Sequence, residues 1–462
     1  MREFRVETDS MGEVKVPADA LYGAQTQRAV ENFPISGLRI PRRLIRALGL
    51  VKRAWAEVNR DAGDLDPHLA EAVAEAADEV ARGDHDAQFV VDVFQTGSGT
   101  SSNMNANEVI ANRAIQLLGG TVGSKAPVHP NDHVNRGQSS NDIVPTAIHL
   151  AVLEALEQEL IPALEDLAAA LERKATAFDP VVKIGRTHLQ DAVPIRLGQE
   201  FSGYAAQARK GVERLRACEP RLCELALGGT AVGTGLNAPP GLPERVIARL
   251  AETTGLPLRQ NSNLFEALAS KDALVEASGA VRTVAVSLSK VAQDIRWLGS
   301  GPRCGLGEIR LPDLQPGSSI MPGKVNPVLA EMLLMVCAQV QGNDLALVLG
   351  GQGGHFELNT MMPLMAHDLL QSVSLLARGA EVFAARCVEG LKADPARCGE
   401  MVERSLAMVT ALAPRIGYDD AAALAKEAYA TGRTIRDLAR EKKLLPDAEL
   451  EKLLDPRGMT GR

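Results

Sequence analysis

The segment that decides the fold is "LVEASGAVRTVAVSLSKVAQDIRWL", residues 274–298. Apolar side chains recur in this segment with alternating steps of three and four residues. The recurring positions are Leu274, Ala277, Val281, Val284, Leu288, Val291, Ile295 and Leu298. This spacing places the apolar side chains along one side of an α-helix, and it is the heptad pattern of helices that pack lengthwise against one another. The segment therefore predicts one long helix that belongs to a bundle.

Three further segments predict helices of the same kind. A second apolar seam runs through Leu153, Leu156, Leu160, Leu164, Leu167 and Leu171, with Pro162 expected to kink the helix. A third helix is expected to begin at Pro327, with Asn326 as its N-cap, and a fourth covers residues 363–386. Small residues crowd several faces of these helices. We therefore expect a mainly α fold whose bundle continues across the subunits of an oligomer.

The two ends of the chain differ from this bundle. The segments "FRVETDS" and "GEVKVPAD" near the N-terminus predict a small hairpin, whereas the chain after Asp394 is charged and divided into short helices. We expect three domains. Residues 1–138 form a mixed N-terminal domain, residues 139–394 form the long-helix bundle, and residues 395–462 form a small helical domain.

Composition limits the possible functions. The 462 residues carry a net charge of -8 without a long basic run, which argues against a nucleic-acid surface. The N-terminal residues lack the apolar core of a secretory signal, and no uninterrupted apolar run is long enough to span a bilayer. The six cysteines form no C-x-x-C pair. We expect a cytoplasmic protein with reduced cysteines and without a membrane partner.

The segment "GSSIMPGKVNP", residues 317–327, interrupts the apolar helices with polar groups. Gly317 and Gly323 make it pliable, and its prolines exclude a helix interior. Two serines, a lysine and an asparagine therefore lie in a loop that leads into a helix N-terminus. Backbone N–H groups and the helix dipole at such a position favour an anion.

Four other polar segments flank the predicted helices, namely "QTGSGTSSNMNANEVIANRA", "HPNDHVNRGQSSNDIVPTAIHL", "GRTHLQDAVPIRLGQEF" and "GGQGGHFELN". None of them forms a P-loop, a dinucleotide fingerprint, an H-E-x-x-H zinc motif or an iron–sulfur cysteine cluster. His129 and His133 lack a nearby third ligand, so a metal site is not expected. The remaining hydroxyls, amides, lysine and histidine suit a small polycarboxylate and acid–base chemistry without a cofactor.

Taken together and in this order, these segments resemble the fumarase/aspartase superfamily. "GSSIMPGKVNP" matches its signature, and "GSGTSSNMNANEVIANR", "HPNDHVN", "SSND", "GRTHLQD", "LGGTAVGTGLN" and "GSGPRCGLGEI" are similar to the class II, iron-independent fumarate hydratases. The resemblance runs nearly end to end. It implies a homotetramer with one central helix bundle and with each active site assembled from three subunits. It also implies a hydro-lyase of the citric acid cycle that hydrates fumarate to L-malate.

The resemblance also assigns roles to individual residues. Ser318 would remove the proton beside a carboxylate, Lys324 and Asn326 would hold that carboxylate, and His188 paired with Glu331 would serve the departing water. Further substrate contacts would come from Ser98, Gly99, Thr100, Ser139, Ser140, Asn141, Thr187, Ser319 and Val325. The family's second carboxylate site would correspond to His129, Pro130, Asn131 and Asp132.

Two other functions stay open at this stage. Ser101 and the segment "DAVPIRLGQEF" look more like the aspartate ammonia-lyase branch, which releases ammonia instead of water. "PGKVNP" and the Thr187–His188 pair favour the fumarase branch, because the ammonia-lyases usually have alanine and glutamine there. The third hypothesis is a non-catalytic helical scaffold, but such a chain has little reason to keep Ser318, Lys324, Asn326, His188 and Glu331 together.

Overall fold

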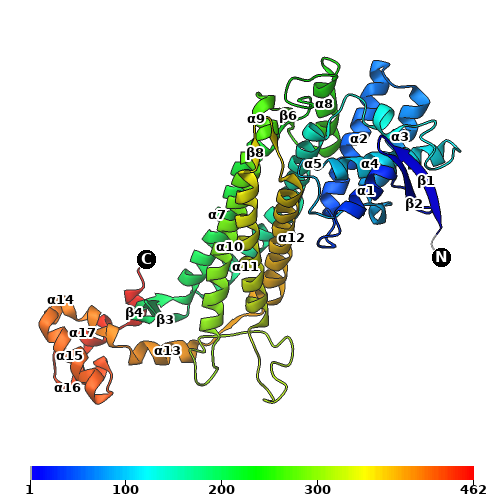
Figure 1. The fold of residues 1–462 in the computed structure, drawn as a ribbon. Coiled ribbons are helices and arrows are strands. Elements are labelled where there is room, and N and C mark those ends of the chain that lie inside the picture. Colours follow the sequence, from blue (N-terminus) through cyan, green and yellow to red (C-terminus); the bar gives the residue numbers. More distant parts are fainter. Residues whose placement is uncertain (1–2, 462) are drawn as a thin grey trace. The chain divides into compact units, whose positions relative to one another are not determined.

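The computed structural model describes residues 3–461, which form two compact units. The first unit contains the described residues up to Ile161, together with Glu213–Thr283 and Gln339–Leu375. The second contains Pro162–Val212, Val284–Ala338 and the described residues from Leu376 onward. Four long helices contribute residues to both units (Figure 1): α7 (Leu197–Leu222), α10 (Asp272–Leu298), α11 (Val328–Gly351) and α12 (Met362–Arg386).

The first unit begins with the expected hairpin, in which β1 (Phe4–Asp9) pairs antiparallel with β2 (Gly12–Pro17). Helices then dominate. They are α1 (Ala24–Asn32), α2 (Arg42–Ala62), α3 (Pro67–Arg82), α4 (Thr100–Leu117), α5 (Ser140–Ala155), α8 (Leu242–Thr254) and α9 (Leu264–Ala269). Short pieces connect them, namely the 3₁₀ turn Asp86–Gln88, the π turn Pro130–Val134, and the strands β5 (Glu224–Leu225), β6 (Arg259–Gln260), β8 (Gly354–His355) and β9 (Leu358–Asn359).

The second unit contains α6 (Ile161–Phe178) from its second residue onward, followed by the hairpin of β3 (Val182–Thr187) and β4 (Gln190–Arg196). The strand β7 (Ile309–Arg310) pairs with β10 (Lys392–Ala393). Short helices complete the unit. They are α13 (Pro395–Arg404), α14 (Ala413–Ile416), α15 (Tyr418–Thr431), α16 (Ile435–Glu441) and α17 (Asp447–Leu453), with 3₁₀ turns at Val388–Gly390, Leu406–Ala411 and Pro456–Met459.

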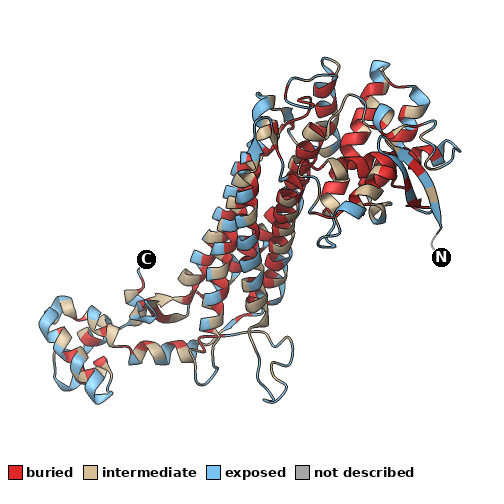
Figure 2. Cartoon of the chain, viewed as in Figure 1, coloured by how far each residue is buried: buried red, intermediate tan, exposed pale blue. Residues whose placement is uncertain are grey.

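The long-helix predictions are confirmed. Helix α10 extends over the whole first seam, and all eight of its apolar positions are buried. The leucines of the second seam are buried as well. Figure 2 shows the consequence, because the long helices carry buried residues along one side and exposed residues along the other. Each Å² of apolar surface that is removed from water stabilises the fold by about 25 cal/mol. Such seams are therefore the main source of stability.

Two local predictions need refinement. The chain takes a π-helical turn at Leu156–Leu160, directly before α6, so the irregularity precedes Pro162. Proline has no N–H to donate, and a π turn is one way in which a helix accommodates that loss. The predicted N-cap is displaced by one residue, because the carbonyl of Pro327 accepts from the N–H of Glu331 and α11 starts at Val328. The side chain of Asn326 instead bonds within the preceding loop.

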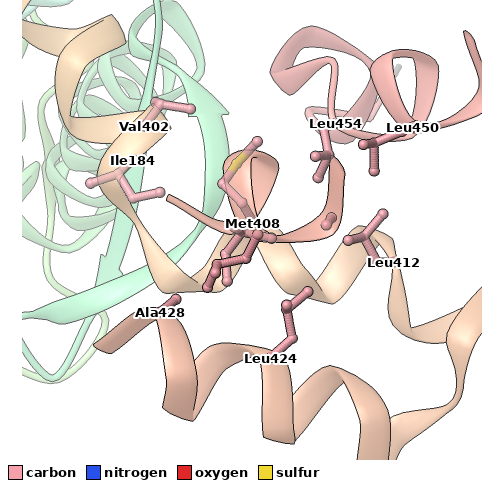
Figure 3. Packing of buried hydrophobic residues seen from close by; sticks show 11 residues of the cluster. Ile184, Val402, Met408, Leu412, Leu424, Ala428, Leu450 and Leu454 are labelled. Atoms are coloured by element: carbon pink, nitrogen blue, oxygen red, sulfur yellow. The ribbon is translucent and has the colours of Figure 1, made fainter. Parts of the chain in front are cut away.

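The short C-terminal helices share a core with the β3–β4 hairpin. Ile184 of β3 lies among buried side chains that include Val402, Met408 and Leu424 (Figure 3). The hairpin thus contributes one of its faces to the core of the C-terminal helices. The division into three domains at residues 138 and 394 stays a prediction.

Helix α11 is unusually apolar on its exposed side. Its mean hydropathy reaches 1.5 over 18 residues or more of helix, and by length and composition alone it is apolar enough to cross a membrane. Met335, Leu345 and Leu349 are all more than half exposed. The sequence of α11 is not one uninterrupted apolar run, because Gln339, Gln341 and Asn343 lie within it.

Candidate active site

A row of hydroxyl groups lies where α4 and α5 begin. The Oγ of Ser98 is 2.9 Å from the Oγ1 of Thr100, which is 2.8 Å from the Oγ of Ser140. Gly99 permits this approach, since it has φ +74° and an added Cβ would come within 2.7 Å of Val144. Three hydroxyls that the sequence separates by up to 42 residues therefore form one hydrogen-bonded row in the first unit. Such groups can donate to the oxygens of a carboxylate.

The start of α5 holds the next predicted group. Ser139 is the N-cap, and its Oγ accepts from the N–H of Asn141 at 3.2 Å. The Nδ2 of Asn141 donates to the carbonyl of Ala231 at 2.8 Å. The N-terminus of a 16-residue helix thus lies beside the hydroxyl row. Helix N-termini carry a partial positive charge, which favours a bound anion.

Asp142 stabilises the start of α5 through hydrogen bonds to its backbone and to a neighbouring loop. It completes the capping box by accepting from the N–H of Ser139 at 3.1 Å. Its other oxygen accepts from the N–H groups of Gly228 and Thr230 at 3.0 and 3.1 Å. Burial raises the pKa of Asp142 to about 6. Asp142 is not among the predicted site residues, although its place three residues after Ser139 is a capping-box signal in the sequence.

Lys52 is the second buried group that sequence reasoning missed. Its Nζ donates to the Oδ1 of Asn135 at 2.9 Å and to the Oε1 of Gln138 at 2.8 Å. Burial lowers its pKa to about 7, against the opposing effect of Asp142. The signal in the sequence is a lysine among the apolar residues Leu48, Val51 and Ala54 of what the structure shows to be α2. A buried cation there keeps the turn before α5 in a fixed conformation.

The loop of residues 317–327, in the second unit, closes on itself. The N–H of Gly317 donates to the carbonyl of Lys324 at 2.8 Å, and the Nδ2 of Asn326 donates to the carbonyl of Gly317 at 2.6 Å. The ammonium group of Lys324 donates to the Oδ1 of Asn326 at 2.8 Å. Lysine and asparagine, both predicted to hold a carboxylate, are therefore adjacent at the start of α11.

Ser318 lies inside this loop with two donors directed at its hydroxyl oxygen. The N–H groups of Ile320 and Met321 lie 3.2 and 3.0 Å from its Oγ. Amide donors of this kind stabilise negative charge on an oxygen that loses its proton. The geometry therefore supplies one means by which a neutral serine can act as a base. Ser319 and Val325 are exposed on the same loop.

Thr187 and His188 lie at the tip of the β3–β4 hairpin. Thr187 pairs with Gln190, so His188 and Leu189 form a two-residue turn. Both turn residues have positive φ, 56° and 60°, which is the backbone of a type I′ hairpin turn. Non-glycine residues adopt this conformation at a cost of about 1–3 kcal/mol, so the turn is held by the strands on each side. The histidine is exposed.

The predicted partner of His188 lies elsewhere. Glu331 is in the first turn of α11, and within residues 3–461 it makes no hydrogen bond or ion pair with His188. The predicted residues therefore form three groups in one chain: the hydroxyl row with the start of α5, the hairpin tip, and the loop with α11. The first group belongs to the first unit and the other two to the second.

The residues of the predicted second carboxylate site form a turn of their own. The Nδ1 of His129 accepts from the N–H groups of Asn131 and Asp132, each at 3.2 Å, and Pro130 begins the π turn. Because Nδ1 is directed at these backbone groups, Nε2 is the ring nitrogen that is left for a ligand. Asp132 lies 3.3 Å from the same Nδ1. The use of this turn as a carboxylate site stays a prediction.

Comparison with known proteins adds to this geometry. Residues 12–342 match the family model described as lyase, and residues 408–461 match the model described as fumarase C C-terminus. The chain is 54% identical over 460 residues to a protein of Nitrosomonas europaea named fumarate hydratase class II, with both chains covered completely. The chain belongs to the class II fumarate hydratase family. A Halobacterium salinarum member is 58% identical, with 100% of this chain and 98% of that protein covered.

Solved structures agree with the family assignment. The class II fumarase of Schistosoma mansoni is 41% identical, covers 99% of each chain and gives a TM-score of 0.96. A Brucella melitensis structure described as fumarate lyase:delta crystallin bound to cobalt is 47% identical, covers 100% of both chains and gives a TM-score of 0.95. The mainly α prediction and the predicted family are both confirmed.

Proposed function

We propose that the protein interconverts fumarate and L-malate by adding and removing water. The observation that carries the proposal is its full-length similarity, at 54–58% identity, to several proteins named fumarate hydratase class II. The same similarity makes the chain a lyase rather than a non-catalytic scaffold. We further propose that it works without a metal or redox cofactor.

In the dehydration direction the reaction first removes a proton from C3 of malate. Ser318, once its hydroxyl has lost its own proton, takes this proton and becomes a neutral hydroxyl again. The electrons of the C–H bond move onto the adjacent carboxylate as a dianionic intermediate. Lys324, Asn326 and the N-terminus of α11 stabilise this added charge. Electrostatic groups of this type typically contribute about 3 kcal/mol each when they are already in place. The two amide donors on the Oγ of Ser318 support its role as base.

The second step breaks the C2–O bond, and the electrons return from the carboxylate to form the double bond of fumarate. Hydroxide is a poor leaving group, so it must gain a proton as the bond breaks. His188 supplies that proton, since histidine is the side chain best suited to this near neutral pH. Glu331 orients the imidazole. Because the two residues do not meet within one chain, we propose that they come from different copies.

The hydroxyl row and the start of α5 hold the substrate. Ser98, Thr100 and Ser140 offer hydroxyl donors, and the helix start adds backbone N–H groups. Asn141 is tied to Ala231, which fixes its side chain. The remaining contacts come from Gly99, Ser139, Thr187, Ser319 and Val325.

We propose a homotetramer built on the long helices. Met335, Leu345 and Leu349 of α11 and Trp297 of α10 leave large apolar surfaces uncovered. Exposed apolar patches of this kind mark interaction surfaces. Four copies that pack through these helices would bury them and would bring the three groups of site residues together. A cytoplasmic location stays a prediction.

Ultraviolet absorbance of fumarate tests the function. The purified protein is given L-malate or L-aspartate separately, and we expect fumarate from malate and at most a trace from aspartate. His188→Gln should lower malate turnover about 100-fold or more, the contribution of general acid catalysis. Abundant ammonia from aspartate with inert malate would instead establish the ammonia-lyase alternative.

A further inference from the structure

We propose that Glu308 and Arg186 form a positioning pair for His188, which no comparison above assigns. The inference rests on the proposed function, in which His188 protonates the leaving water. Glu308 is fully buried, and its two carboxylate oxygens accept from the two terminal nitrogens of Arg186 at 2.9 and 3.1 Å. A paired, planar contact of this kind fixes both direction and distance.

The hairpin transmits this fixed position to the histidine. Arg186 is followed directly by Thr187 and then by His188 at the turn, which is only two residues long. A short hairpin leaves few torsions between an anchored side chain and the turn. The anchor at Arg186 therefore determines where the imidazole lies.

An irregularity of the β3–β4 hairpin lies next to this contact. Side chains alternate between the two faces of a regular strand, so residues 183 and 186 would point in opposite directions. The register of the hairpin shifts between Ile184 and Arg186, which is a β-bulge. Its extra residue lies in β4, because the partners of Ile184 and Arg186 are Pro194 and Asp191. The ammonium of Lys183 nevertheless lies 3.5 Å from Glu308, on the same carboxylate that holds Arg186. Bulges are found beside active sites because they redirect a side chain.

Glu308 is itself firmly held by its backbone. Its N–H donates to the carbonyl of Leu298 at the end of α10, and its carbonyl accepts from the N–H of Asp394, both at 2.9 Å. These bonds do not involve the carboxylate. A change confined to the side chain of Glu308 therefore leaves the path of the chain toward the 317–327 loop intact and releases only the hairpin.

Glu200 provides a matched control. It approaches the same Lys183, with its Oε2 at 3.3 Å, but it does not contact Arg186. Loss of either glutamate removes one of the two negative charges that lie near the ammonium group of Lys183. Only the loss of Glu308 removes the anchor of the hairpin, so the two variants separate a general effect on the buried charges from the positioning of His188.

The experiment compares two rates for each variant with malate in D₂O. One is release of fumarate, which requires both steps, and the other is exchange of the C3 hydrogen, which requires only the step at Ser318. Glu308→Gln should lower fumarate release about 10- to 100-fold, the range seen when a partner that orients a catalytic group is removed. Exchange should fall much less, so the ratio of exchange to release should rise. The same rise is expected for His188→Gln. Glu200→Gln should keep the ratio of the unaltered protein.

Arg186→Lys extends the test. Lysine keeps the positive charge beside Glu308, so the net charge of the buried groups is unchanged, but it cannot form the paired contact with both carboxylate oxygens. This variant should raise the same ratio, which keeps the test valid if Glu308→Gln does not fold. A parallel fall of both rates in Glu308→Gln or Arg186→Lys, or an equal rise in Glu200→Gln, would overturn the positioning role. An unaltered protein that is inactive on malate would instead overturn the proposed function.

Discussion

At the scale of single residues, the proposed chemistry depends on one hydroxyl oxygen, which acts as the base, and on the two amides directed at it. Removing the Oγ of Ser318 removes the base but leaves the bonds among Gly317, Lys324 and Asn326 in place. Ser318→Ala should therefore abolish malate turnover while the oligomer and helical content stay unchanged. Steady-state kinetics and circular dichroism measure both. Ser202→Ala, an exposed serine of α7, is the control, and near-normal turnover by Ser318→Ala would mean that another group takes the proton.

A second residue-scale prediction concerns stability in acid. The Nδ1 of His149 lies 3.0 Å from the carbonyl of Leu222, and burial, together with the charge of Lys271, lowers its pKa to about 4. Its pKa in the unfolded chain is close to the ordinary 6.5. Between pH 6.5 and 4 the unfolded state therefore binds more protons, so His149 makes the fold less stable as the pH falls through this window.

The size of this effect follows from the same two values. The difference between 6.5 and about 4 corresponds to a loss of roughly 3 kcal/mol of unfolding free energy once the pH has fallen below both values. Chemical unfolding of the unaltered protein and of His149→Gln at pH 7 and pH 4.5 measures it. The variant should lose less stability on acidification than the unaltered protein. His68→Gln, at an exposed position on α3, should behave like the unaltered protein. Equal losses in all three would contradict the prediction.

Residue types and their order predict much of the candidate site. The polar segments identified Ser98, Thr100, Ser140, Ser318 and Lys324 before any contact was known. The buried supports were harder to find. Lys52 and Glu308 act through partners 83 to 122 residues away, and such contacts depend on tertiary packing that no local pattern encodes.

At the scale of elements, the 317–327 loop must close in one conformation. Gly317 has no room for a side chain, because an added Cβ would overlap the carbonyl oxygen of Lys324. Gly317→Ala should therefore open the loop and lower turnover about tenfold or more, since a misplaced catalytic group typically loses such factors. Gly399→Ala in α13, where nothing lies within 4 Å, is the control and should keep full activity. Kinetics of both variants provide the measurement, and full activity of Gly317→Ala would contradict the role of this closure.

The helices are the elements that the sequence predicts best. A row of apolar residues with steps of three and four matches the period of an α-helix and not that of a strand. Helix α10 extends over the whole row. The start of α11 was predicted one residue too early because the local signal of Asn326–Pro327 competes with the loop. The asparagine side chain bonds to Gly317 and Lys324 instead of capping the helix. The β-bulge in β4, opposite Gly185, left no signal in the sequence.

At the scale of the whole molecule, the proposed site residues belong to two units and the long helices are partly uncovered. If the apolar faces of α10 and α11 pack against other copies, a charge placed there should prevent assembly. Met335→Glu, at a position that is 68% exposed, should lower the mass measured by light scattering and lower turnover with it. Met11→Glu is the control, because Met11 is also exposed, to 79%, but lies in the β1–β2 turn. An active oligomer of unchanged mass would exclude α11 from the interface.

The assembly also decides whether His188 and Ser318 of one active site belong to the same chain. His188→Gln chains keep an intact Ser318, and Ser318→Ala chains keep an intact His188. If one site takes these residues from different copies, mixed oligomers contain some sites with both groups intact. If equal amounts of the two variant chains mix at random in a closed symmetric assembly, about a quarter of the sites should contain both an intact His188 and an intact Ser318. The two variants are expressed together, purified as one oligomer and assayed with malate, beside each variant alone. Activity well above both single variants is the expected result, whereas a mixture as inactive as its parts would place both groups in a single chain.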